Sequence, residues 1–178
     1  MINEIKKVLI SEEQIKERNR ELGQQITADY EGKELLAVCI LRGSYIFFSD
    51  LTREIELPLE VAFMHAASYF AGTESSGNVN LPDQNMLSVA GKDVLLVEDI
   101  IDSGRTLAAL KQTLLEKGVN SLKIVTLLDK PERRVVDVDV DYSGFTVPDE
   151  FVVGYGLDYN QRFRNLKYIG VLKEEVYQ

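Results

Sequence analysis

Two adjacent carboxylates, Glu98 and Asp99, stand just before a small polar turn that runs from Asp102 to Thr106. A turn of this composition offers backbone N–H groups and hydroxyls, which are the donors that bind a phosphate monoester. Carboxylates beside a phosphate repel it unless the ligand also carries hydroxyl groups or a metal ion. A phosphorylated ribose carries such hydroxyls. We therefore expect Glu98 and Asp99 to bind its 2- and 3-hydroxyls while the turn binds its 5-phosphate.

The elements on either side of the turn are a strand and a helix. Residues 94–98 form a short apolar run, typical of a strand buried on both faces. After the turn, leucines recur at helical spacing until Gly118, which is expected to end the helix near Lys117. An isolated Asp-Ser-Gly is more often a plain turn beside a solvated strand end. Here the whole string of residues 94–106 resembles the phosphoribosyl-pyrophosphate motif of the type I phosphoribosyltransferases, with strand, turn and helix where that motif has them, which favours the functional interpretation.

A second turn, Leu41 to Ser44, offers a weaker anion site. It follows an apolar strand over residues 35–41 and precedes a helix expected over residues 45–51. The guanidinium of Arg42 and the backbone of Gly43 could bind a pyrophosphate group. On its own such a segment is better read as a simple turn, and its interest comes from lying near the first phosphate turn.

The order of the elements predicts how the two turns come together. A capping box at Ser11 starts an amphipathic helix, and residues 135–157 contain short β-like pieces. Strands alternating with helices indicate a mostly parallel α/β sheet. Ligands of such sheets bind at the carboxyl ends of the strands, where all the polar segments fall. The predicted strands are residues 35–41, 59–64, 94–98 and 122–128.

Four more residues are candidates for ligand binding, and two of them have an ordinary alternative. Lys130 is either a solvated lysine or a donor to the carbonyl oxygen of a base, which would select a 6-oxo over a 6-amino purine. Phe151 is either core or a face on which a base stacks, worth about 1–3 kcal/mol. Asp158 is a plausible Mg²⁺ ligand, and Arg164 a plausible partner of pyrophosphate.

Composition excludes several classes of protein. The chain has 178 residues, enough for one domain with a full core, and its net charge of −9 argues against binding to nucleic acid or to an anionic membrane. One cysteine, Cys39, excludes an internal disulfide and is expected to be a buried thiol, and the single His65 cannot form a histidine cluster. With no signal-peptide pattern and no apolar run near 18 residues, we expect a cytoplasmic protein.

Taken together, four segments resemble the 6-oxopurine branch of the type I phosphoribosyltransferase family over nearly the whole chain. The last segment is specific to that branch. The resemblance implies a five-stranded, mostly parallel sheet flanked by helices. It also implies one domain over residues 1–178, with a small hood made by the N-terminal segment and about residues 150–178. A mobile loop over about residues 68–83 would carry the lid residues Ser68 and Tyr69. The four segments are residues 41–44, 97–104, 127–130 and 151–160.

The activity implied by the resemblance is a glycosyltransferase reaction of purine salvage. The 5-phosphoribosyl group of phosphoribosyl pyrophosphate (PRPP) would pass to hypoxanthine and guanine, releasing pyrophosphate. Asp102 would be catalytic, accepting the purine N7 proton, and Mg²⁺ would be the cofactor. A homodimer or homotetramer is expected. The implied PRPP-binding residues are Glu98, Asp99, Asp102, Ser103, Gly104, Arg105 and Thr106; Arg42, Gly43 and Arg164 would bind pyrophosphate; Lys130, Phe151, Val152 and Asp158 would bind the purine; Glu98, Asp99 and Asp158 would bind the metal.

Two alternatives remain open at this stage. One is a phosphoribosyltransferase for another base; Lys130 and residues 151–160 disfavour adenine and pyrimidines, but not guanine or xanthine. The other is an RNA-binding regulator built on the same fold. Such a regulator needs a basic face, and the net charge of −9 with no evident Lys/Arg stripe disfavours it.

Overall fold

The computed structural model describes residues 2–65 and 89–177. The predicted loop over residues 68–83, with Ser68 and Tyr69, therefore lies outside the described residues. Within the described residues, no helix has both the length and the apolar character needed to cross a membrane.

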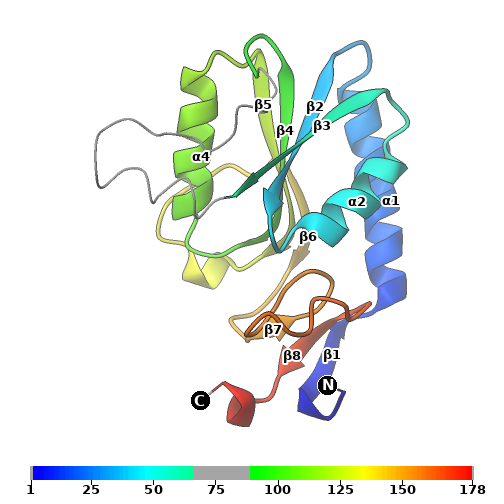
Figure 1. Cartoon of the computed structure of the whole chain (residues 1–178), viewed down its shortest axis with the longest axis vertical. Helices are drawn as coiled ribbons and strands as arrows, with labels where there is room; N and C mark the ends of the chain where they lie inside the picture. Colours follow the sequence, from blue (N-terminus) through cyan, green and yellow to red (C-terminus); the bar gives the residue numbers. More distant parts are fainter. Residues whose placement is uncertain (1, 66–88, 178) are drawn as a thin grey trace.

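The main sheet has five strands, all parallel, and this confirms the predicted fold class (Figure 1). The strand order β3-β2-β4-β5-β6 places β4 at the centre. β4 continues to Ile101, beyond the predicted end at residue 98, so Glu98 and Asp99 belong to the strand. The strands are β2 (Leu35–Leu41), β3 (Leu59–His65), β4 (Asp93–Ile101), β5 (Ser121–Asp129) and β6 (Tyr142–Thr146).

Helices cover both faces of this sheet, which explains why its central strands are continuous apolar runs. Alternate residues of β2 point to opposite faces: Ala37 and Cys39 join the cluster packed under α1 (Glu12–Asp29) and α2 (Tyr45–Glu54). Val38 and Ile40 join the cluster packed under α4 (Arg105–Glu116). In Figure 1, α1 and α2 lie on one side of the sheet and α4 on the other. The sheet is thereby held between two apolar layers.

Local signals place the helix ends where the sequence predicts them. Ser11 Oγ accepts a hydrogen bond from the Gln14 amide, and Gln14 Oε1 accepts one from the Ser11 amide, so the predicted capping box of α1 is present. α4 ends at Glu116, and Gly118 follows with a φ of 76°. That left-handed conformation suits glycine, which confirms its role in ending the helix.

A second, smaller sheet lies beyond the carboxyl ends of the parallel strands (Figure 1). It is antiparallel with the order β1-β8-β7, and it joins segments far apart in the chain, since Ile5 pairs with Leu172. Neither β1 (Ile5–Ile10) nor β8 (Ile169–Leu172) is among the strands that the sequence predicts. The other elements of the described residues are β7 (Val152–Val153) and three short 3₁₀ helices, η1 (Ile2–Glu4), η2 (Pro131–Arg133) and η3 (Glu174–Val176).

Candidate active site

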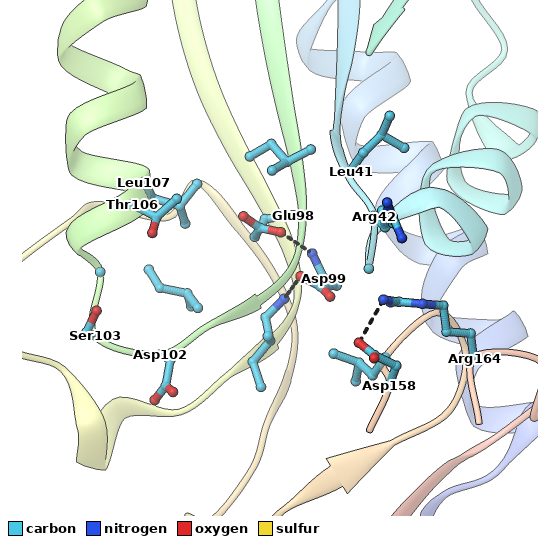
Figure 2. A pocket seen from close by; sticks show the side chains of 16 residues that line it. Leu41, Arg42, Glu98, Asp99, Asp102, Ser103, Thr106, Leu107, Asp158 and Arg164 are labelled. Carbon is cyan, nitrogen blue, oxygen red and sulfur yellow. Dashed lines mark hydrogen bonds and ion pairs between the residues drawn. The ribbon is translucent and has the colours of Figure 1, made fainter. Parts of the chain in front are cut away.

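A cavity of about 400 Å³ opens between the carboxyl ends of β2 and β4 and the loop that follows β7 (Figure 2). Three segments far apart in the sequence supply its walls, as the parallel sheet predicts. Ten of the predicted site residues line it: Arg42, Gly43, Glu98, Asp99, Asp102, Ser103, Gly104, Thr106, Asp158 and Arg164.

The two adjacent acids do not act as a side-by-side pair. Because successive strand residues point to opposite faces, Glu98 is directed toward Thr106 and Leu107, whereas Asp99 is directed toward Arg42 and Asp158 (Figure 2). Among the described residues, no three His, Cys, Asp or Glu side chains form a group suited to a metal ion. The predicted joint metal ligands Glu98, Asp99 and Asp158 therefore do not form a metal cluster made by the protein alone.

Glu98 is a buried acid on the central strand. Its side chain is enclosed, with the residue 8% exposed, and its Oε1 accepts a hydrogen bond from the Asp99 amide at 3.0 Å. Burial raises the pKa of Glu98 well above its ordinary value, and the nearby Asp99 carboxylate raises it further. In the free protein, the charged form of the Glu98 carboxyl group is therefore disfavoured.

The turn from Asp102 to Thr106 has the form of an anion site. Gly104 precedes α4 with a φ of 82° and has no side chain to cap the helix. The Arg105 amide makes a long hydrogen bond of 3.4 Å to Ser103 Oγ, and the amides of the first turn can reach an external acceptor. Ser103 and Thr106 add hydroxyls at the cavity wall. Arg105 differs from its neighbours, because it is exposed and does not line the cavity. All residues of the predicted turn except Arg105 thus line the cavity.

The segment from Leu41 to Ser44 reaches the same cavity and includes a cis peptide bond between Leu41 and Arg42. Gly43 lies so near Asp99 that a Cβ built on it would be 1.6 Å from Asp99 Oδ2. Ser44 is buried, donates a hydrogen bond to the Ile40 carbonyl, and lies 3.3 Å from Cys39 Sγ. Cys39 is fully buried, which confirms the predicted buried thiol, and burial raises its pKa to about 11, which disfavours the thiolate.

The far wall belongs to the loop after β7. Gly156 has a φ of 104°, and a Cβ on it would be 2.0 Å from the Gly43 carbonyl oxygen. Arg164 donates to the Gly156 carbonyl at 2.7 Å and pairs with Asp158 Oδ1 at 2.8 Å (Figure 2). Asp158 Oδ2 accepts the Gln161 amide at 2.8 Å. The loop therefore presents an acid and an arginine that already neutralise each other.

The remaining purine-binding candidates lie outside this cavity. Lys130 is 6% exposed and its Nζ donates to the Glu150 carbonyl at 2.7 Å, so the solvated-lysine alternative is wrong. Phe151 is 37% exposed and stacks on Tyr177 with 4.8 Å between ring centroids. Val152 is buried and pairs with Val171 of β8. These side chains form a separate patch between the end of β5 and the small sheet.

Sequence reasoning missed the residues that support the site. Gly156 lacks a side chain where the loop after β7 meets Gly43, and its place in a Gly-Tyr-Gly run was an available signal. Arg134 donates from Nε to the Asp102 carbonyl at 3.2 Å and also pairs with Asp129. No local pattern distinguishes Arg134 from a surface arginine, because its contacts are made across the sheet edge.

Comparison with known proteins agrees with this geometry. A family model described as a phosphoribosyl transferase domain matches residues 9–160. The chain belongs to the phosphoribosyl transferase family.

Its curated relatives identify a branch within that family. A hypoxanthine-guanine phosphoribosyltransferase of Lactococcus lactis is 56% identical over 173 residues, covering 97% of this chain and 94% of that protein. One of Staphylococcus aureus is 51% identical over 99% of both chains. The crystal structure of a hypoxanthine phosphoribosyltransferase from Staphylococcus aureus matches with a TM-score of 0.91 and 51% identity, covering 100% of this chain and 97% of the other.

The close approach of Gly43 to Asp99 yields a first prediction. In Gly43→Ala, the added methyl group must displace the Asp99 carboxylate, which is the end of a side chain and can move at little cost to folding. We expect turnover to fall by up to about 10²-fold because a group that positions the substrate is misplaced. The melting temperature should change by less than about 4 °C.

Gly91→Ala is the matched control. Gly91 has a φ of 75° and no atom within 4 Å of an added Cβ, so alanine there is strained but blocks nothing. It should lower the melting temperature without altering turnover. Normal turnover in Gly43→Ala would show that the position of Asp99 is unimportant.

The burial of Glu98 yields a second prediction. Glu98→Gln keeps the acceptor for the Asp99 amide but removes a charge that burial and Asp99 both disfavour. We expect the free protein at neutral pH to gain about 1 kcal/mol, or about 2–4 °C in melting temperature, while turnover falls. Thermal unfolding and a turnover assay on the same samples test this, and a destabilised variant would contradict it.

Proposed function

We propose that this chain transfers the 5-phosphoribosyl group of PRPP to N9 of hypoxanthine and guanine, giving the nucleoside 5-phosphate and pyrophosphate. The observation that carries the proposal is the single cavity shared by the Asp102–Thr106 turn, Asp99 and the Asp158–Arg164 pair. The names of the relatives support the 6-oxopurine as the acceptor. We propose that the reaction takes place in the cytoplasm and that the protein binds neither nucleic acid nor membranes.

The turn binds the 5-phosphate in this proposal. The uncapped first turn of α4 supplies amides, Ser103 and Thr106 supply hydroxyls, and the helix dipole favours the anion. Asp99 accepts hydrogen bonds from the ribose hydroxyls across the cavity. Glu98, on the other face of the strand, accepts a hydrogen bond from the Asp99 amide and so helps to hold Asp99 in place. Arg105 contributes its backbone N–H rather than its exposed side chain.

Pyrophosphate lies between the second turn and the far loop. The backbone of Gly43 and the guanidinium of Arg42 approach it from β2, and Arg164 approaches it from the opposite wall. Arg42 is exposed and makes a 3.3 Å hydrogen bond to Gln161, so it is free to change partner. These donors hold the leaving group against the net negative charge of the protein.

Mg²⁺ fits the acids of this cavity. Carboxylate oxygens are the ligands that it prefers, and it commonly takes only one or two from the protein while phosphates and water supply the rest. Asp99 and Asp158, with Glu98 behind them, would hold the ion. When bound, it would neutralise the charge that develops on pyrophosphate as the bond to the sugar breaks.

The purine binds in the patch beside the cavity. Lys130 exchanges its hydrogen bond to the Glu150 carbonyl for one to the 6-oxo oxygen of the purine. A 6-amino group cannot accept this hydrogen bond, so an aminopurine is rejected. Phe151 offers the ring face that Tyr177 does not cover. The backbones of Val152 and Asp158 contact the opposite edge of the base.

Asp102 is the proposed general base. It lines the cavity beside the phosphate turn, where it can accept the N7 proton of the purine, or hold it in a hydrogen bond, as N9 attacks the sugar carbon. This raises electron density on the attacking nitrogen. General base assistance of this kind contributes about 10²–10⁴-fold to a rate.

The small sheet serves as the hood over the base within a single domain, and Ser68 and Tyr69 form the lid. A homodimer or homotetramer is proposed from the exposed apolar side chains on one edge of the main sheet. Phe63 and Val61 on the edge strand β3 are 56% and 44% exposed, and Tyr45 nearby is 43% exposed. Burial of such side chains favours association of two copies.

The role of Asp102 gives a third prediction. Asp102→Asn should lower kcat by about 10²-fold or more, because the amide cannot take the proton. Affinity for PRPP should stay within a few-fold, since the backbone of the turn is unchanged. Steady-state kinetics with hypoxanthine and isothermal titration with Mg-PRPP measure the two effects, and unchanged turnover would remove Asp102 from its role.

The role of Lys130 gives a fourth prediction. Lys130→Ala should raise KM for hypoxanthine at least about tenfold, since a lost hydrogen bond to a charged group is worth about 1.5–3 kcal/mol. KM for PRPP should change much less. Lys92→Ala is the control, because Lys92 is also an ion-paired lysine with most of its side chain buried, but it precedes β4 at the opposite end of the sheet from Lys130. Equal effects on both substrates would indicate a general structural role for Lys130.

A further inference from the structure

One carboxylate oxygen of Asp102 has an unusual environment. Oδ1 is enclosed and accepts no hydrogen bond of good geometry from the described residues. Its charged neighbour is Arg133, whose Nε lies 3.2 Å away as an ion-pair partner. The Asp102 side chain as a whole is 47% exposed, so Oδ2 is the oxygen left to meet a ligand. The two carboxylate oxygens of Asp102 thus differ in the free protein: Oδ1 is enclosed beside Arg133, and Oδ2 is available to a ligand.

Arg133 also reaches toward the purine patch. Its Nη1 lies 3.5 Å from Asp149 Oδ1, and the same oxygen lies 3.7 Å from Lys130 Nζ. Asp102, Arg133, Asp149 and Lys130 therefore form an alternating chain of negative and positive groups. This chain runs from the proposed general base to the proposed donor for the 6-oxo group.

The backbone on both sides of Arg133 is fixed to the phosphate turn. The amides of Val135 and Val136 both donate to the Ser103 carbonyl, at 3.1 and 3.0 Å. Arg134 donates to the Asp102 carbonyl, and its guanidinium is anchored by Asp129. Because the main chains of the two segments are held together, Arg133 is kept within reach of the Asp102 side chain.

We propose that Arg133 is a positioning residue, which turns the Asp102 carboxylate so that Oδ2 faces N7 of the bound purine. N7 and the 6-oxo oxygen share one edge of a 6-oxopurine, so their acceptor and donor must be held at a fixed spacing. Asp149 joins Arg133 to Lys130 and sets that spacing. The inference rests on the proposed role of Asp102 as general base.

Three variants test the inference by steady-state kinetics with hypoxanthine and PRPP. Arg133→Ala should lower kcat about three- to tenfold, because an exposed ion pair orients the base without itself reacting. KM for PRPP should stay within about twofold. Arg133→Lys should recover most of the lost turnover, since it keeps the charge beside Asp102. Arg20→Ala is the matched control, because Arg20 also forms an exposed ion pair, with Glu17, far from the cavity.

A double-mutant cycle separates positioning from general structural support. In an Asp102→Asn background, Arg133→Ala should cause no further loss of the residual turnover, since it acts through that carboxylate. An equal loss in both backgrounds would overturn the inference, as would a selective rise in KM for PRPP, which would make Arg133 a phosphate ligand. If Asp102→Asn lowers turnover and Arg133→Ala does not, the inference alone fails. If Asp102→Asn has no effect, the role of Asp102 itself fails.

Discussion

The absence of side chains at Gly43 and Gly156 lets the end of β2 lie against the Asp99 side chain on one side and against the backbone of the loop after β7 on the other. A Cβ on Gly43 would overlap the Asp99 carboxylate, and one on Gly156 would overlap the Gly43 carbonyl. The end of β2 is therefore enclosed between the central strand and the loop after β7. The loop that rests on Gly43 also carries the Asp158–Arg164 pair, so this contact helps to position the far wall of the cavity. The two glycines thus allow the loop after β7 to lie directly against the end of β2.

An acidic protein that holds polyanionic ligands needs local cations, and here those cations already have partners. Arg164 pairs with Asp158, Arg133 lies against Asp102, and Lys130 donates to the Glu150 carbonyl. Ligand binding would exchange these contacts for contacts of the same kind rather than create them. Such pairing keeps the long side chains ordered in the free protein, so less conformational entropy is lost when the ligand arrives.

The main sheet and the phosphate turn could be predicted because their signals are local. The apolar run at residues 35–41 coincides with β2, and Gly118 ends α4 as expected. The opposite directions of Glu98 and Asp99 were missed because the sequence places the strand end too early, at residue 98. β1 was missed because charged residues, Lys6 and Lys7, interrupt its apolar pattern. Its partner β8 could not be found from the sequence, since pairing across such a separation leaves no local trace.

The pairing of β1 with β8 also sets an order of events during synthesis on the ribosome. The five parallel strands are complete once residue 146 has emerged, so the phosphate turn can take shape on a sheet that is already whole. β1 precedes these strands in the chain, yet it can pair only after its partner β8 (Ile169–Leu172) has emerged. Contacts between such distant residues form slowly, because a long loop must close first. The parallel sheet and the phosphate turn can therefore form before the small sheet, and the far side of the cavity is completed only once β8 has emerged.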